Sequence, residues 1–174
     1  MNKNLSKILV FTLSFILCQT LFAYSEEDKS NKEKLETNYI TVQEDPNNSL
    51  GIIYASNKLN QVTQQLTNGN LDEAIKELEE LSTWLTNATD NHYELYSSFS
   101  KNAELKSASK LEKAYAHDFA ELRDKSYYLL AQSYIRQNKL RKAVELLVKI
   151  VSSQPDSELG NEAYKSLQKI RFSD

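Results

Sequence analysis

The chain has 174 residues, of which 26% are charged and 40% apolar, as is usual for a single globular domain. It contains only 3 Gly and 2 Pro, which excludes collagen-like, linker-like and proline-rich architectures and disfavours a turn-rich all-β fold. The formal net charge of -3 provides no basic field, so we expect no nucleic-acid partner. The composition favours an all-α protein.

Residues 1–23 have the pattern of a secretory signal peptide. Lys3 and Lys7 form a short basic head, an apolar run begins at Ile8, and small Ala23 precedes a polar stretch. The apolar run is shorter than the roughly 20 residues that a membrane-spanning helix needs, which favours cleavage after Ala23. We therefore predict an exported protein in the periplasm or another extracytoplasmic compartment, with no cysteine left to form a disulfide.

Two alternatives to cleavage are open. Leu21 is larger than the residue usual three positions before a cleavage site, so the segment could remain as an uncleaved membrane anchor. Only in that case do we expect contact with a membrane. Lipidation at Cys18 is the other alternative, and it is disfavoured because the preceding Leu17 is not small.

Residues 24–50 are polar and patchily charged. The stretch SEEDKSNKEKLE has no apolar helical face to bury, and EDPNNS is a cluster of turn-forming residues. We predict a flexible linker over residues 24–50, followed by a helical domain over residues 51–174.

The helical domain begins with a predicted antiparallel hairpin. The apolar residues of its first helix follow a 4, 3, 4 spacing: Ala55, Leu59, Val62 and Leu66. Asn68-Gly69-Asn70 ends this helix, and Asn70 is a candidate cap for the next one. The second helix repeats the spacing at Ala74, Leu78, Leu81 and Leu85. Two such stripes bury each other when the helices pack side by side.

Residues 90–125 contain two further apolar runs without a Gly or Pro. The first comprises Tyr93, Tyr96 and Phe99, with Asp90 as a candidate cap, and the second extends from Leu105 to Leu122. One long helix and two helices with a joint near Lys101-Asn102 are both compatible with this pattern.

A second hairpin follows. Its first helix carries apolar residues at Tyr127, Leu130, Ala131 and Tyr134. After an Asn138-Lys139 turn, the facing stripe comprises Ala143, Val144, Leu147, Ile150 and Val151. Gln154-Pro155-Asp156 ends this helix, and Asp156 or Ser157 caps a last helix with apolar residues at Ala163, Tyr164, Leu167 and Ile170.

Residues 124–157 resemble one tetratricopeptide repeat, a 34-residue helix-turn-helix unit. The residues that carry the resemblance are Tyr127, Leu130, Ala131, Tyr134, Asn138, Ala143, Leu147, Ile150 and Pro155. The first hairpin matches only in its second half, because polar Lys58, Gln61 and Gln65 stand where the family has apolar residues. The resemblance implies stacked helical hairpins in a short array with a C-terminal capping helix. The number of repeats is open, and a plain helical bundle is the alternative.

The resemblance also implies a concave groove for a partner. The repeat offsets that face such a groove are occupied by Lys125, Tyr128, Gln132 and Arg136, which we predict to bind the partner. Tyr127 and Tyr134 are expected in the core. Some family members clamp a C-terminal carboxylate with Lys and Asn where this chain has Tyr128 and Gln132, so we do not expect that specificity. Basic residues of the second hairpin and acidic residues of the first are a further candidate for orienting an acidic partner or for self-association.

The sequence offers no constellation for catalysis. His92 and His117 have no neighbouring His or Cys, and we expect them at the surface or at helix caps. Gly51, Gly69 and Gly160 are isolated, which excludes a glycine-rich phosphate loop, and no serine lies in a G-x-S-x-G motif. We therefore expect no enzyme, no catalytic residue, no metal and no cofactor.

The predicted function is a non-catalytic, exported adaptor or assembly factor of the cell envelope, a scaffold that binds a protein or peptide in a helical-repeat groove. The alternative is a self-associating structural or stress-related helical protein. In that case the many Tyr and Phe residues between Tyr93 and Tyr134 would form the interface between copies.

Overall fold

The computed structural model describes residues 45–172, and the side chains of residues 45–170. The helices in this range are α2 (Ile52–Thr67), α3 (Leu71–Phe99), α4 (Lys106–Arg136), α5 (Leu140–Ser153) and α6 (Glu158–Phe172), with a short 3-10 helix, η1 (Ala103–Leu105). No strand occurs among the described residues, so the all-α prediction is confirmed. The predictions for residues 1–23 and for most of the linker lie outside this range.

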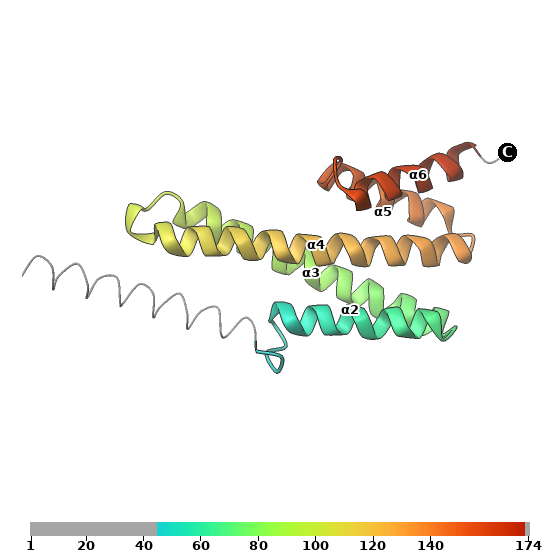
Figure 1. Ribbon diagram of the computed structural model, residues 1–174, viewed down its shortest axis with the longest axis horizontal. Helices are drawn as coiled ribbons and strands as arrows, with labels where there is room; N and C mark the ends of the chain where they lie inside the picture. Colours follow the sequence, from blue (N-terminus) through green and yellow to red (C-terminus); the bar gives the residue numbers. More distant parts are fainter. Residues whose placement is uncertain (1–44, 173–174) are drawn as a thin grey trace, which may run out of the picture. The chain divides into compact units, whose positions relative to one another are not determined.

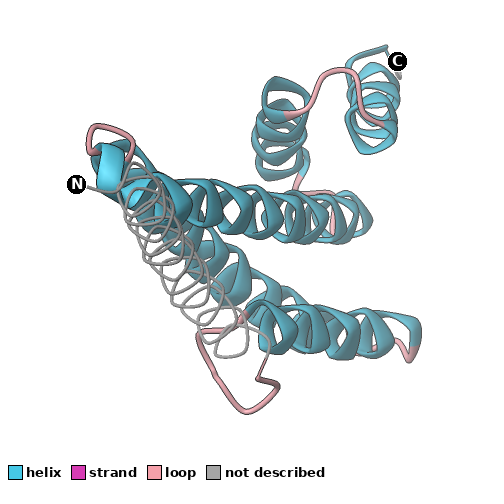
Figure 2. Cartoon of the chain, turned by 60° about the vertical axis from the view of Figure 1, so that its left-hand side comes forward, coloured by secondary structure: helices cyan, strands magenta, loops and turns pink. Residues whose placement is uncertain are grey.

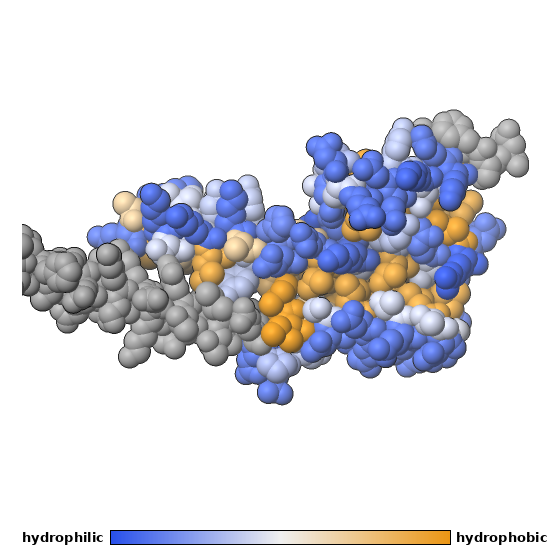
Figure 3. All heavy atoms as spheres, viewed as in Figure 1, coloured by the Kyte–Doolittle hydropathy of each residue, from blue (hydrophilic) through white to orange (hydrophobic). Residues whose placement is uncertain are grey.

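The helices form two layers. In Figure 1, α2, α4 and α6 lie nearer to the viewer, and the fainter α3 and α5 lie behind them. Figure 2 shows the same helices and their connecting loops from a second direction. One continuous core joins the five described helices, with Leu78, Phe119 and Leu147 fully buried in it. Figure 3 shows apolar side chains gathered between α2 and α4. The predicted array of antiparallel hairpins is therefore present in residues 45–172. Within that range, no helix is both long enough and apolar enough to span a membrane.

The first hairpin, α2 and α3, forms as predicted. Ala55 and Val62 of α2 are completely buried, as are Ala74 and Leu78 of α3. Gly69 makes the turn with a φ of 88°, in the left-handed region that glycine adopts without strain. Asn70 occupies the N-cap position of α3, but its side chain makes no capping hydrogen bond.

The weak match of α2 to the repeat pattern has a specific cause. Lys58 Nζ lies 2.7 Å from Glu77 Oε2, and Gln65 Nε2 donates to Glu77 Oε1 at 3.0 Å. Two of the polar residues on α2 therefore hold a carboxylate of α3, in a position where the family pattern has apolar packing. Hydrogen bonds from Lys58 and Gln65 lower the pKa of Glu77 below its ordinary value of 4.5.

α3 is longer than the sequence predicted. Asp90 does not begin a new helix, because α3 continues through it to Phe99. The adjacent Thr89 is buried and donates to the carbonyl of Leu85 at 2.8 Å, so it stays within the helix instead of interrupting it. The chain turns only after Phe99, where the Asn102 side chain accepts from the Glu104 amide at 3.0 Å. Of the two arrangements compatible with the sequence, two helices with a joint near Lys101-Asn102 is correct.

The two longest of the described helices, α3 and α4, pack against each other in antiparallel orientation (Figure 1). Trp84 and His92 of α3 contact the fully buried ring of Phe119, Trp84 edge-on with ring centres 5.9 Å apart and His92 stacked at 5.2 Å. His92 Nδ1 lies 2.6 Å from the carboxylate of the buried Glu112. His92 was predicted at the surface or at a helix cap, and that prediction is wrong, because His92 lies inside α3 with its side chain covered by the facing helix. His117 is exposed, as predicted.

The C-terminal helices follow the predicted turns. Asn138 takes a φ of 55°, in the left-handed region, and so occupies the turn between α4 and α5 where the repeat pattern has glycine. The Ser157 hydroxyl accepts from the Gly160 amide at 2.9 Å, so Ser157 caps α6. Gly160 is in close contact with the end of α5: a Cβ at this position would lie 2.0 Å from the carbonyl oxygen of Gln154. α6 buries Ala163 and Leu167 and covers the last hairpin as a capping helix.

The Glu77 contacts predict acid sensitivity of the first hairpin. A carboxylate whose pKa is lowered in the folded state stabilises the fold above its unfolded pKa, and this contribution is lost as the pH falls through the lowered value. Wild type should therefore lose more stability than Glu77→Gln between about pH 6 and about pH 3, in denaturant unfolding followed by circular dichroism. Glu80→Gln, at an exposed neighbour, should follow wild type; equal losses in all three proteins would contradict the prediction.

Candidate functional site

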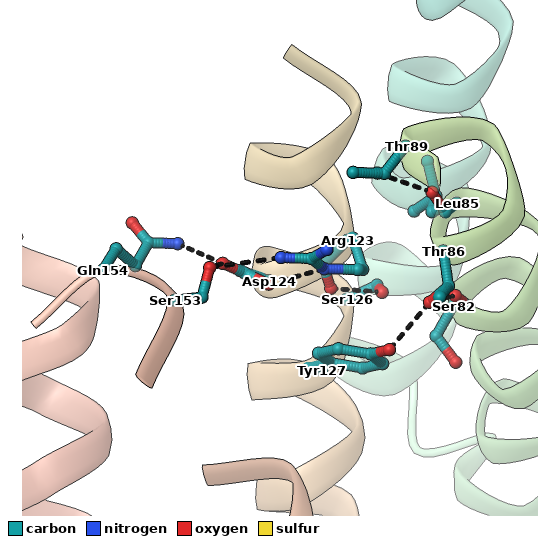
Figure 4. A network of polar contacts seen from close by, with 10 residues as sticks. All are labelled: Ser82, Leu85, Thr86, Thr89, Arg123, Asp124, Ser126, Tyr127, Ser153 and Gln154. Atoms are coloured by element: carbon teal, nitrogen blue, oxygen red, sulfur yellow. Dashed lines mark hydrogen bonds and ion pairs between the residues drawn. The ribbon is translucent and has the colours of Figure 1, made fainter. Parts of the chain in front are cut away.

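A buried carboxylate connects α4 to the end of α5. Asp124 is 1% exposed, and its carboxylate accepts from Arg123 Nε at 2.9 Å, Ser153 Oγ at 2.5 Å and Gln154 Nε2 at 2.7 Å (Figure 4). These bonds join the first residue of the predicted repeat to the residues just before Pro155. They set the relative position of α4 and α5. The sequence analysis did not identify this network, since a single Asp on a helix gives no periodic signal.

Two tyrosines connect the second hairpin to α3. Tyr127 exchanges a hydrogen bond with Thr86 at 2.7 Å, and Tyr134 donates to the carboxylate of Glu79. Burial and the Glu79 carboxylate raise the pKa of the Tyr134 phenol, which keeps it protonated as a donor. Both rings lie in the core, as predicted.

The opposite charges of the two hairpins meet within the chain. Lys142 Nζ of α5 lies 3.6 Å from Glu79 Oε1 and 5.0 Å from the ring centre of Tyr134. Gln137 Nε2 donates to Asp72 Oδ1 at 2.6 Å. Part of the charge asymmetry that suggested an acidic partner or self-association is therefore used to hold α3 against α4 and α5.

Half of the eight Tyr and Phe residues from Tyr93 to Tyr134 are buried and not available as a surface. The buried ones are Tyr115, Phe119, Tyr127 and Tyr134. Tyr93 is the most exposed large apolar side chain of α3, and its ring lies 5.8 Å from that of Tyr96. The buried aromatic residues of this range all belong to α4, whereas those at the end of α3 are exposed or partly buried.

A concave part of the surface of the repeat lies between α4 and α6. It contains two hollows, which we call together the α4–α6 groove. The first, of about 300 Å³, is lined by Glu121, Lys125, Gln154, Ser157, Glu158, Leu159 and Glu162. The second, of about 250 Å³, is lined by Gln132, Ile135, Leu140, Ser166, Lys169 and Ile170. Gln132 Nε2 donates to Ser166 Oγ at 3.3 Å and thereby connects the two helices across the groove.

The structure brings two of the four predicted partner-binding residues into this groove. Lys125 lines the first hollow, where its Nζ lies 3.9 Å from Glu121 Oε2, and Gln132 lines the second. Tyr128, between them on α4, is partly buried and packs against the core. Arg136 is exposed at the last residue of α4 and lines neither hollow.

The residues that α6 contributes to the groove were not predicted from the sequence. The sequence analysis placed candidates on α4 alone, because the repeat pattern gives offsets only within residues 124–157. The burial of Ala163 and Leu167, which were recognised as apolar, fixes the face that α6 turns to the core. That orientation brings Glu158, Glu162 and Lys169 to the groove.

Metal binding finds no support within the described part of the chain. No group of three or more His, Cys, Asp or Glu side chains there could hold a metal ion. The carboxylates of the first hollow are accompanied by an ammonium group, that of Lys125, which makes the hollow a polar surface rather than a chelating site.

Removing the Asp124 carboxylate should destabilise the protein strongly. In Asp124→Ala the donors of Arg123, Ser153 and Gln154 lose a buried charged acceptor, so we expect a loss of about 3 kcal/mol in the free energy of unfolding. Urea unfolding measures it. Asp118→Ala, at an exposed position of the same helix, should change stability by less than about 0.5 kcal/mol. A loss in Asp124→Ala no larger than in this control would refute the role assigned to the network.

Comparison with known proteins agrees with this architecture. The family described as "Tetratricopeptide repeat" matches residues 124–157, the same range that the sequence analysis assigned. No curated protein and no solved structure matches the chain. Tetratricopeptide repeats generally mediate protein–protein interaction, and proteins that contain them are typically non-catalytic. Residues 124–157 are thus recognised as one tetratricopeptide repeat within the all-α array of the described helices.

Proposed function

We propose that this protein is a non-catalytic adaptor or assembly factor that binds a partner protein in the α4–α6 groove. The observation that carries the proposal is the groove itself, which opens on the matched repeat and its capping helix. Its two hollows follow one another along α4, as the binding surface for an extended segment requires. The exposed Lys125 lies in the first hollow together with the carboxylates of Glu121, Glu158 and Glu162, which suits recognition of a polar segment of a partner protein.

The proposal includes an extracytoplasmic location, in the cell envelope or an equivalent compartment. Its support is the order of basic, apolar and small residues over residues 1–23. We expect the native protein to begin at Tyr24, as measured by the intact mass of the protein purified from its source. A mass that retains residues 1–23 would favour the membrane-anchored form instead.

Site-specific photo-crosslinking tests the groove. A benzoylphenylalanine at position 125 or 132 should give a discrete adduct with a partner protein in cells, because both positions line the groove. The same group at Glu145, an exposed position of α5 outside both hollows, should give none. Adducts of equal yield at all three positions would show that the groove is not the binding site of the partner.

Charge reversal provides the matched comparison. With the crosslinker at position 132, Glu158→Lys together with Glu162→Lys should reduce the adduct several-fold, because both carboxylates are exposed and line the first hollow. Glu80→Lys together with Glu145→Lys makes the same change in net charge at exposed positions outside both hollows and should leave the yield unchanged. If the two pairs act alike, the effect is one of net charge and the assignment is wrong.

A further inference from the structure

The α4–α6 groove differs chemically from one end to the other. The first hollow contains the carboxylates of Glu121, Glu158 and Glu162 and the single ammonium of Lys125, which gives three negative charges and one positive. The second hollow contains no carboxylate; its apolar lining comes from Ile135, Leu140 and Ile170, with Lys169 as the only charge. A partner segment that fits one hollow does not fit the other.

The first hollow favours a cation. Lys125 and Glu121 lie 3.9 Å apart and compensate each other, which leaves the two carboxylates of α6. Glu158 and Glu162 are four residues apart on one helix, so they are neighbours of like charge on the same face. Both are exposed, and neither has an ion-pair partner among the described side chains. A guanidinium or ammonium group placed between them would relieve this repulsion and form charge-assisted hydrogen bonds.

The second hollow favours an aliphatic side chain. Leu140 is 37% exposed and sits at the start of α5, while Ile135 and Ile170 are partly buried around it. Apolar surface that is still in contact with water gains free energy when a second apolar side chain covers it. The volume of about 250 Å³ accommodates one Leu, Ile or Val side chain with room for the adjoining backbone.

The distance between the hollows sets the spacing of the two anchors. Lys125 and Gln132 mark the two hollows and are seven residues apart on α4, or about 10 Å along the helix axis. An extended chain advances about 3.3 Å per residue, so about three residues span this distance. We propose that the groove binds an extended segment of the partner protein in which a Lys or Arg stands three positions from a Leu, Ile or Val. This inference rests on the proposed function and specifies its ligand.

Four labelled peptides test the inference on the full-length protein. The first two are fluorescein-labelled octapeptides with Arg and Leu three positions apart in an Ala/Gln background, one in each order. The other two replace Arg by Glu or Leu by Ser. In fluorescence anisotropy, one of the two orders should bind at least about tenfold tighter than both replacement peptides, which corresponds to at least about 1.4 kcal/mol.

Charge reversal in the hollow should invert the preference. Glu158→Lys together with Glu162→Lys should make the Glu peptide bind better than the Arg peptide, whereas Glu145→Lys, on the exposed side of α5, should not. Leu140→Ser should weaken the Arg–Leu peptide and leave the Ser peptide unchanged. Circular dichroism checks that each variant retains the wild-type fold.

The possible failures are distinguishable. If the peptides bind without discrimination, or do not bind, or the double reversal leaves the order of affinities unchanged, the proposed ligand is wrong. The crosslinked adduct at positions 125 and 132 would still support the adaptor function in that case. If the adduct is absent as well, both proposals are overturned.

Discussion

The carboxylate of Asp124 is the contact on which the geometry of the C-terminal half depends. It is buried and charged, and two of its three donors come from the end of α5, so any shift of α4 relative to that end would break hydrogen bonds to a buried charge. Ser153 is the last residue of α5, and Gln154 begins the short loop that leads to α6. The position of α6, and with it the width of the α4–α6 groove, therefore follows from a polar contact rather than from apolar packing alone.

The first hairpin forms a repeat-like pair of helices although part of the contact between its helices is polar. α2 and α3 bury the apolar residues that their periodicity predicted, yet one contact between them is ionic. Lys58 and Gln65 hold Glu77 where apolar side chains would be usual for the family, so the family match is confined to the second hairpin. Helical hairpins of this kind tolerate the exchange because the backbone arrangement depends on the apolar stripe, which α2 retains in Ala55 and Val62.

Local patterns in the sequence predicted the helices, the turns at Gly69 and Asn138, and the cap at Ser157, because each depends on residues close together in the chain. Contacts between distant residues could not be predicted in this way. His92 is mostly enclosed because Glu112 and Phe119 of the facing helix reach it, and Asp90 lies inside α3, which continues to Phe99. The groove was predicted from α4 alone, since the orientation of α6 follows only once Ala163 and Leu167 are packed.

Gln154 takes part in two contacts at once. Its side-chain amide donates to Asp124, and its carbonyl oxygen lies where only a glycine, Gly160, allows α6 to approach. Gln154 therefore links the approach of α6 to the buried network on α4, in addition to the hydrogen bond from Gln132 to Ser166. As a consequence, the separation of α6 from α4 is restricted at this end of the groove, because it would disturb both contacts of Gln154.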